Sequence, residues 1–246
     1  MRKQIPNLIT CMNVISGTLA IFLAMYGLLT AAAILILVGM VFDFFDGMTA
    51  RLLHVKSEIG KELDSLADMV SFGVAPAILA YFLIVRELPG GDFLHFATWT
   101  LGQQITAVMP VVIAPFSAYR LAKFNIDVRQ ATSFIGMPTP ANALFWVCLV
   151  FGSYYTPELY MTLFGKPGVL ASSALILSIL LISELPMFSL KISGFGWREN
   201  KIRYCYFICL IISAGIWGKG ILIFIIPLYI LFSVVEALIK ITTSNR

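Results

Sequence analysis

The sequence has few charged residues and no long polar stretch. Asp, Glu, Lys and Arg make up only 12% of the 246 residues, whereas about a quarter is usual in soluble proteins. No polar stretch approaches the length of about 50 residues that the smallest ordinary domains need. The basic residues form no stripe, so the net charge of +4 does not indicate a nucleic-acid partner.

Cysteine is also scarce, and its spacing excludes two kinds of site. All four cysteines lie in apolar segments, at Cys11, Cys148, Cys205 and Cys209, and none forms a Cys-x-x-Cys pair. Neither a zinc site nor a disulfide framework is therefore predicted. We expect these residues to be small buried hydrophobic side chains.

Long apolar runs are present instead. The chain is 59% hydrophobic, with a mean hydropathy of +0.91, and about 20 apolar residues are enough for a helix to span a bilayer. We predict an all-α, polytopic integral membrane bundle that forms a single domain over residues 1–246. About eight transmembrane segments are expected, at roughly 7–28, 30–53, 62–86, 99–123, 139–156, 168–190, 201–216 and 220–240.

The basic residues predict an orientation for this bundle. If the amino terminus is inside, all but three of the 17 Lys and Arg residues lie on the inner side, and the exceptions are Arg86, Lys166 and Lys219. Cytoplasmic ends of membrane helices carry such an excess of positive charge. We therefore predict that both termini are cytoplasmic, together with the connection between the second and third segments.

That connection belongs to an acidic stretch, DFFDGMTARLLHVKSEIGKELDSLADMVS, which interrupts the apolar pattern. Asp43 and Asp46 are three residues apart, and Asp64 and Asp68 are four apart, so each pair shares one helix face. Four converging carboxylates would repel one another, and one Asp at a helix centre already costs about 2.5–3.5 kcal/mol on insertion scales. Oxygen ligands suit Mg²⁺, Mn²⁺ or Ca²⁺, and paired divalent ions are typical of phosphoryl displacement.

A second interpretation of the stretch has to be weighed. The acids could belong to a solvated interfacial loop in which they pair with Arg51, Lys56 and Lys61. Two pairs on helix faces, with the small residues Gly47 and Ala50 beside them, favour the metal site. The same small residues are also consistent with close helix packing, and both roles can hold together.

The full pattern resembles the signature of the CDP-alcohol phosphatidyltransferases. It reads Asp43-x-x-Asp46-Gly47-x-x-Ala50-Arg51, eight residues, then Gly60-x-x-x-Asp64-x-x-x-Asp68, and all eight defining positions are present. The resemblance implies a six-helix core, with the segments after about residue 200 peripheral to it, and usually a homodimer. It also implies displacement of CMP from a CDP-linked substrate by a hydroxyl group.

The resemblance assigns roles to the signature residues. It implies that Asp43, Asp46, Asp64 and Asp68 hold divalent metal, Mg²⁺ or Mn²⁺ and two ions in number, and that Asp68 is also the general base. Gly47, Ala50 and Gly60 would line the cytidine side, and Arg51 would approach the phosphates or the aspartates.

The acceptor alcohol is indicated by three further stretches, 71–77, 119–125 and 134–141, which resemble the phosphatidylserine synthase branch of the family. They imply CDP-diacylglycerol and L-serine as substrates; glycerol 3-phosphate or an inositol compound is the alternative acceptor. We expect Arg120, with Lys123, to bind the serine carboxylate, although the positive-inside distribution alone would explain both cations. Ser71 and Asn125 are further candidates for acceptor binding, and packing or helix capping would explain them equally well.

Other classes of protein fit the sequence less well. A cation-coupled transporter would also place acids in the membrane, but inverted repeats are expected there and no second Asp-rich segment is present. An aspartate-rich prenyltransferase does not require the fixed Gly, Ala and Arg positions. The site offers no obvious Ser or Cys nucleophile beside a base, so we favour direct attack by the acceptor.

Overall fold

The computed structural model describes residues 4–55, 57–90, 93–127, 134–188 and 197–244, and nearly all of them are helical. This confirms the predicted all-α bundle. The amino-terminal half comprises α1 (Gln4–Met25), α2 (Leu29–Leu52), α3 (Glu58–Asp68), the π-helical turn η1 (Met69–Val74), α4 (Ala75–Glu87), η2 (Phe93–Thr98), α5 (Leu101–Val108), η3 (Met109–Val112) and α6 (Ile113–Ile126). The remaining elements are β1 (Phe134–Ile135), α7 (Thr139–Tyr155), α8 (Pro157–Phe164), α9 (Pro167–Ile182), β2 (Pro186–Met187), α10 (Trp197–Trp217), η5 (Gly218–Gly220) and α11 (Ile221–Ser244).

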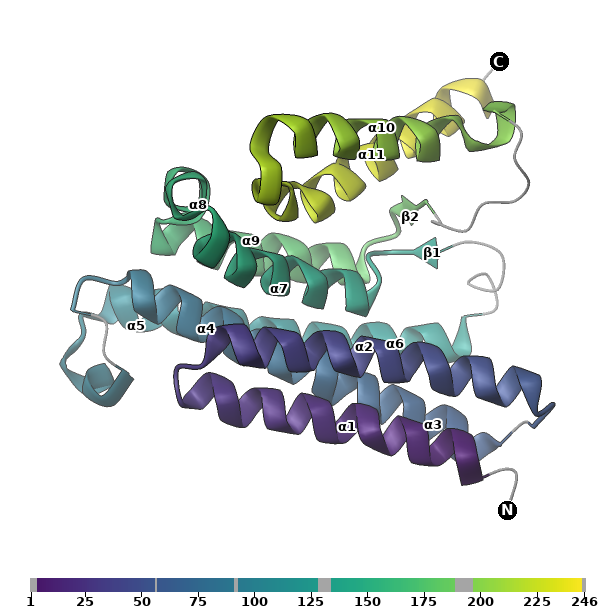
Figure 1. Ribbon diagram of the computed structural model, residues 1–246, viewed down its shortest axis with the longest axis horizontal. Coiled ribbons are helices and arrows are strands. Elements are labelled where there is room, and N and C mark those ends of the chain that lie inside the picture. Colours follow the sequence, from purple (N-terminus) through teal and green to yellow (C-terminus); the bar gives the residue numbers. More distant parts are fainter. Residues whose placement is uncertain (1–3, 56, 91–92, 128–133, 189–196, 245–246) are drawn as a thin grey trace.

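The long helices are stacked with their axes roughly parallel, whereas the short α8 is seen nearly end-on (Figure 1). The hairpin of α1 and α2 forms one side of the bundle, and the hairpin of α10 and α11 forms the other. Between them, α7 packs against both α2 and α11, while α6 packs against η1 and α9. The carboxyl-terminal hairpin therefore joins the bundle through α7 and β2, at a distance from α1 and α3.

The number of membrane crossings depends on how the helices are grouped into spans. By length and composition, five helices among the described residues are able to span a membrane, or up to six if the bent pair α8 and α9, at 72°, forms one span. The 40-residue candidate Asn200–Ile239 contains both α10 and α11, and α7 has only 17 residues. Six of the eight predicted segments each overlap one helix, whereas 62–86 covers α3, η1 and α4, and 99–123 covers α5, η3 and α6. The sixth segment, 168–190, was drawn too long, because α9 ends at Ile182. The prediction of about eight crossings stays a prediction.

The two ends of the bundle differ in the elements that they collect. The first turn of α1, the last turn of α11, the α2–α3 connection and both strands lie at one end (Figure 1). Ser153 and Tyr155 lie near the end of α7, at the other end of the bundle. Arg86, in the last turn of α4, donates to Ser153, and Lys219 lies over the ring of Tyr155. This arrangement agrees with the grouping of loops that the basic residues predicted, and which side faces the cytoplasm stays a prediction.

The short pairing of β1 with β2 fixes the start of α7 beside the end of α9. Phe134 pairs with Met187 and Ile135 with Pro186 in an antiparallel register. Gly136 follows with a φ of 76°, and a Cβ there would meet the carbonyl oxygen of Leu181 at 2.6 Å, so the turn requires glycine. The pairing therefore helps to position the first turn of α7, which contains polar residues.

The cysteines are only partly where the sequence predicted them. Cys148 is buried, but Cys11 and Cys205 are exposed on the surface of the bundle. The expectation of burial was wrong for these two and holds only in part for Cys209, which is half-buried, because the outer face of a membrane helix can be apolar without contacting protein.

Candidate active site

The four signature aspartates come from two antiparallel helices. Asp43 and Asp46 lie in the later part of α2, whereas Asp64 and Asp68 lie on α3. Ser57 begins α3 as its N-cap, with its hydroxyl accepting a hydrogen bond from the amide of Gly60 at 3.2 Å. This cap ends the short connection and starts α3 in the direction opposite to α2, so the two acidic helix faces meet.

Three of the four carboxylates converge. Oxygen atoms of Asp43, Asp64 and Asp68 all lie within 4.8 Å of one another, and each side chain is half-buried. Their charges repel, and Asp46 adds to the repulsion on Asp43 and Asp64. Such a set of oxygen ligands fits a hard divalent cation, which would replace the repulsion with attraction. The residues present therefore fit the predicted kind of metal.

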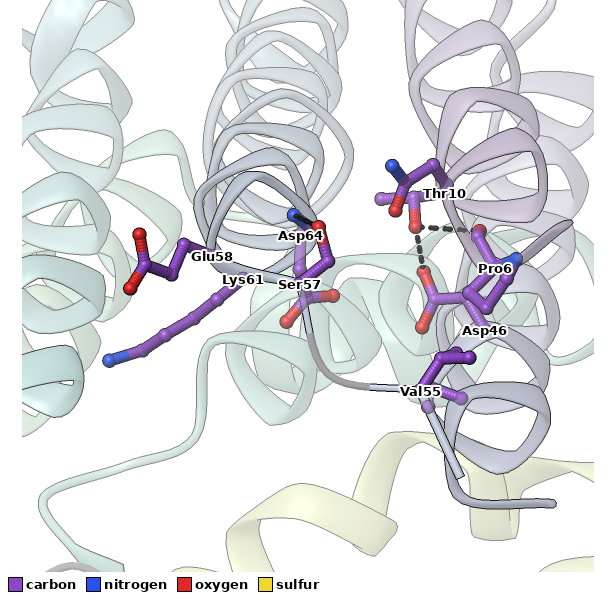
Figure 2. Close-up of a pocket in the computed structure, with 12 residues that line it drawn as sticks. Pro6, Thr10, Asp46, Val55, Ser57, Glu58, Lys61 and Asp64 are labelled. Atoms are coloured by element: carbon purple, nitrogen blue, oxygen red, sulfur yellow. Dashed lines mark hydrogen bonds between the residues drawn. The ribbon is translucent and has the colours of Figure 1, made fainter. Parts of the chain in front are cut away.

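Asp46 is not part of this group of three and is hydrogen-bonded to α1 instead. Its Oδ2 atom accepts a hydrogen bond of 2.6 Å from the hydroxyl of Thr10, and its residue is only 6% exposed. The same hydroxyl lies 3.1 Å from the carbonyl oxygen of Pro6, as Figure 2 shows. Asp46 of α2 is thus bonded to α1. It lines a pocket, and its charge also acts on Asp64.

The first helix supplies a second polar contact. Asn13 is fully buried, and its Nδ2 lies 3.5 Å from Oδ1 of Asp68, at the limit of a hydrogen bond. Neither Thr10 nor Asn13 was predicted from the sequence to belong to the site. A signal was present, because Asn7, Thr10 and Asn13 recur every third residue in an otherwise apolar helix, which places them along one side of it.

A pocket of about 640 Å³ opens beside the carboxylates (Figure 2). Its walls come from α1, α2, the α2–α3 connection and the start of α3, and its lining residues are Pro6, Asn7, Thr10, Asp46, Gly47, Ala50, Val55, Ser57, Glu58, Gly60, Lys61 and Asp64. All three small residues of the signature line it. A Cβ at Gly47 would meet no described atom within 4 Å, so the space beside it is open.

Two signature residues lie differently with respect to this pocket. A Cβ at Gly60 would come within 3.0 Å of Oδ1 of Asn7, so glycine allows α1 and α3 to approach each other there. Arg51 is exposed, and it is not among the described residues that line the pocket. Its contact with phosphates or with the aspartates stays a prediction.

Among the acceptor candidates, Arg120 is the one whose charge interacts with Asp68. It is 6% exposed on α6, donates from Nη1 to the hydroxyl of Thr139 at 3.1 Å, and lies over the ring of Phe124 at 5.2 Å. Its charge is attracted by Asp68. A buried guanidinium whose charge interacts with the acidic cluster can hold an anionic group near it.

The other three candidates already have protein partners. Lys123 forms an ion pair of 2.5 Å with Glu184, and Asn125 donates to the hydroxyl of Ser65 at 2.7 Å. Ser71 is fully buried and donates to the carbonyl oxygen of Asn13 at 2.9 Å. A Cβ at Gly17 would overlap the Ser71 side chain, so Ser71 packs at the crossing of α1 with η1. Acceptor binding by these three stays a prediction, and each already has a contact within the bundle.

Comparisons with known proteins extend this description. The family model of the CDP-alcohol phosphatidyltransferases matches residues 3–183. The chain belongs to this family, as the signature predicted. The match ends where α9 has ended, so it leaves α10 and α11 outside.

Among similar curated proteins, the CDP-diacylglycerol–serine O-phosphatidyltransferase of Bacillus subtilis (strain 168) is 40% identical over 158 residues, which cover 64% of this chain and 80% of the relative. The enzyme of the same name from Helicobacter pylori (strain ATCC 700392 / 26695) is 34% identical over 177 residues, covering 68% and 69%. The archaetidylserine synthase of Methanothermobacter thermautotrophicus is 34% identical over 179 residues, covering 71% and 67%.

Proposed function

We propose that this integral membrane protein transfers the phosphatidyl group of CDP-diacylglycerol to the hydroxyl of L-serine, giving phosphatidylserine and CMP. The observation that carries the proposal is the convergence of Asp43, Asp64 and Asp68 beside a pocket lined by Gly47, Ala50 and Gly60. Serine as the acceptor is supported by the names of the similar proteins and by the buried Arg120 near Asp68.

The pocket between α1, α2 and α3 binds the CDP part of CDP-diacylglycerol; we call it the nucleotide side. Asp43, Asp64 and Asp68, with Asp46, would hold two divalent ions, Mg²⁺ or Mn²⁺. When bound, such ions polarise the pyrophosphate and offset the charge that develops on CMP. The open space beside Gly47 and Ala50 accommodates the cytidine, while the acyl chains remain in the lipid.

The acceptor side is organised around Arg120 and Asp68. The guanidinium binds the serine carboxylate through a charge-assisted hydrogen bond, which orients the serine hydroxyl toward the acidic cluster. Asp68 takes the hydroxyl proton as the serine oxygen attacks the phosphorus of the phosphatidyl group. The new oxygen–phosphorus bond forms as the bond to CMP breaks, and CMP leaves with the electron pair.

We further propose that the site and both termini face the cytoplasm and that the protein is a homodimer. The first part is supported by the positive-inside distribution and by the position of the acidic site at the bundle end that collects the termini. The dimer is supported by the family resemblance alone.

The experiment that tests the function is a CMP-release assay on the purified protein, with CDP-diacylglycerol and Mg²⁺ or Mn²⁺. L-serine, glycerol 3-phosphate and inositol are supplied separately as acceptors. Release that depends on L-serine and disappears in Asp68→Asn supports the proposal. Release with one of the other acceptors alone would retain the site and overturn the choice of serine.

A further inference from the structure

A group of buried polar side chains lies between α6 and α7, outside the pocket described above. It consists of Ser117 and Arg120 on α6 and Thr139 and Asn142 on α7, and we call it the polar seam. All four residues are at least 94% buried, since Arg120 is 6% exposed and the others are 0% exposed. The hydrogen bond of 3.1 Å between Arg120 and Thr139 joins the two helices.

The polar seam contains hydrogen-bonding atoms that no described residue satisfies. They are the hydroxyl oxygen of Ser117, Nε of Arg120, and both Nδ2 and Oδ1 of Asn142. Burial of an amide with neither end paired is strongly unfavourable, and native proteins pair the large majority of such groups. Asn142 leaves both a donor and an acceptor unpaired, and Nε of Arg120, which bonds to the same first turn of α7 through Thr139, is unpaired too; this is the pattern of a site that a polar ligand completes.

The geometry connects the polar seam to the acidic cluster. Thr139 and Asn142 are three residues apart and so share a face of α7, and Ser117 and Arg120 share a face of α6 in the same way. Gly73, on the turn that directly follows Asp68, packs against Ser117, since a Cβ there would lie 3.2 Å from its Cβ. The polar seam therefore extends from the neighbourhood of Asp68 into the bundle.

We propose that Asn142 is an acceptor-binding residue that selects an α-amino acid. The inference rests on the proposed function and adds a residue to it. Oδ1 of Asn142 accepts a hydrogen bond from the ammonium group of serine, and Nδ2 donates to its carboxylate, which Arg120 also binds. The unpaired donor and acceptor of Asn142 thus match the charged groups of an amino acid. Glycerol 3-phosphate has no ammonium group and could offer Oδ1 only a neutral hydroxyl donor, which makes a weaker hydrogen bond than a charged one.

The test is the variant Asn142→Leu, which keeps the approximate size of the side chain and removes both polar atoms. We expect the KM for L-serine to rise more than about tenfold, the effect of losing hydrogen bonds to a charged group, while the KM for CDP-diacylglycerol is unchanged. The thermal unfolding midpoint should not fall, because an apolar replacement of an unpaired buried amide is nearly neutral or stabilising.

A second readout separates binding from a structural role. The wild type should discriminate strongly between L-serine and 3-hydroxypropionate, which is serine without its ammonium group. Asn142→Leu should lose most of that discrimination, a result that misfolding or general loosening of the bundle does not produce. Ser153→Ala, near the other end of α7, is the matched control and should retain both KM values and the discrimination.

A further variant covers the case in which Asn142→Leu does not fold. Asn142→Asp has nearly the same shape and retains the acceptor oxygen, but it replaces the donor with a negative charge that repels the serine carboxylate, so its KM for serine should also rise. Serine KM values within twofold of the wild type in the folded variants would overturn the inference. If the proposed function itself fails, the wild type will release no CMP with serine, which is a different outcome.

Discussion

The two sides of the site are built in different ways. The nucleotide side, between α1, α2 and α3, is an open pocket whose walls include Gly47, Ala50 and Gly60. The proposed acceptor side, at η1, α6 and α7, is closed, and its polar groups are almost fully buried. An open pocket beside the lipid accommodates a bulky nucleotide with acyl chains, whereas a closed polar site suits a small charged acceptor. In the proposed function, the acidic cluster serves both sides, since Asp64 lines the pocket and the charge of Asp68 interacts with that of Arg120.

The largest effect is expected where the two sides meet. Asp68→Asn should lower kcat by about a hundred- to ten-thousandfold, because the variant removes the proposed proton acceptor and one carboxylate of the cluster. Steady-state CMP release measures the effect. Glu62→Gln, an exposed acid on the same helix, is the control and should behave as the wild type. Equal losses in both variants would show that charge on α3, rather than the cluster, matters.

On the acceptor side, Arg120→Ala should raise the KM for serine by about thirtyfold or more, since truncating one member of a buried charge pair costs about 2–5 kcal/mol. Arg120→Lys should recover only part of the loss, because it keeps the charge without the planar fork. Lys123→Ala is the comparison, and it should change the serine KM much less, because Glu184 already engages that lysine. An unchanged serine KM in both Arg120 variants would remove Arg120 from the acceptor site.

On the nucleotide side, Gly47→Leu should fill open space instead of disturbing packing, since a Cβ at Gly47 meets no described atom within 4 Å. The KM for CDP-diacylglycerol should rise by about tenfold, in the range that steric misfit in a pocket produces, with the serine KM unchanged. Gly215→Leu, at an exposed position on α10 with similar open space, is the matched control. A rise in both KM values would contradict a separation of the two sides.

The smallest effect is expected from the support that α1 gives to Asp46. Thr10→Val removes the hydroxyl that donates to Asp46 and keeps the shape, so kcat/KM should fall by about two- to tenfold, the range for one hydrogen bond. Thr18→Val on the same helix removes only a bond to the backbone of Val14 and should have no such effect. If Thr10→Val retains full activity, its hydroxyl is not needed to position Asp46.

The same difference between the two sides explains what could be predicted from the sequence. The nucleotide side is encoded in one continuous stretch, from Asp43 to Asp68, whose helical spacing and small residues indicate a metal site directly. The structure brings Asp43, Asp64 and Asp68 together and places Gly47, Ala50 and Gly60 at one pocket, as such spacing predicts. The helical bundle was equally readable, because long apolar runs leave a membrane chain few other folds.

The acceptor side could not be read in the same way. Asn142 is one polar residue in an apolar run, and its relation to Arg120 depends on how α7 packs beside α6. Lys123 was grouped with Arg120 because of its charge. Glu184 lies 61 residues later in the chain, so the sequence gave no sign that Lys123 and Glu184 would pair. Contacts between helices far apart in sequence follow from tertiary packing, which local spacing does not encode.

The most direct test of the account follows the serine itself. Isotopically labelled L-serine is incubated with the purified protein, CDP-diacylglycerol and Mg²⁺ or Mn²⁺, and the label is counted in the lipid extract while CMP is measured in the aqueous phase. We predict that label enters the lipid in the same molar amount as CMP appears, and that Asp68→Asn abolishes both. CMP release without label in the lipid would contradict the account, because the phosphatidyl group would then have passed to an acceptor other than serine.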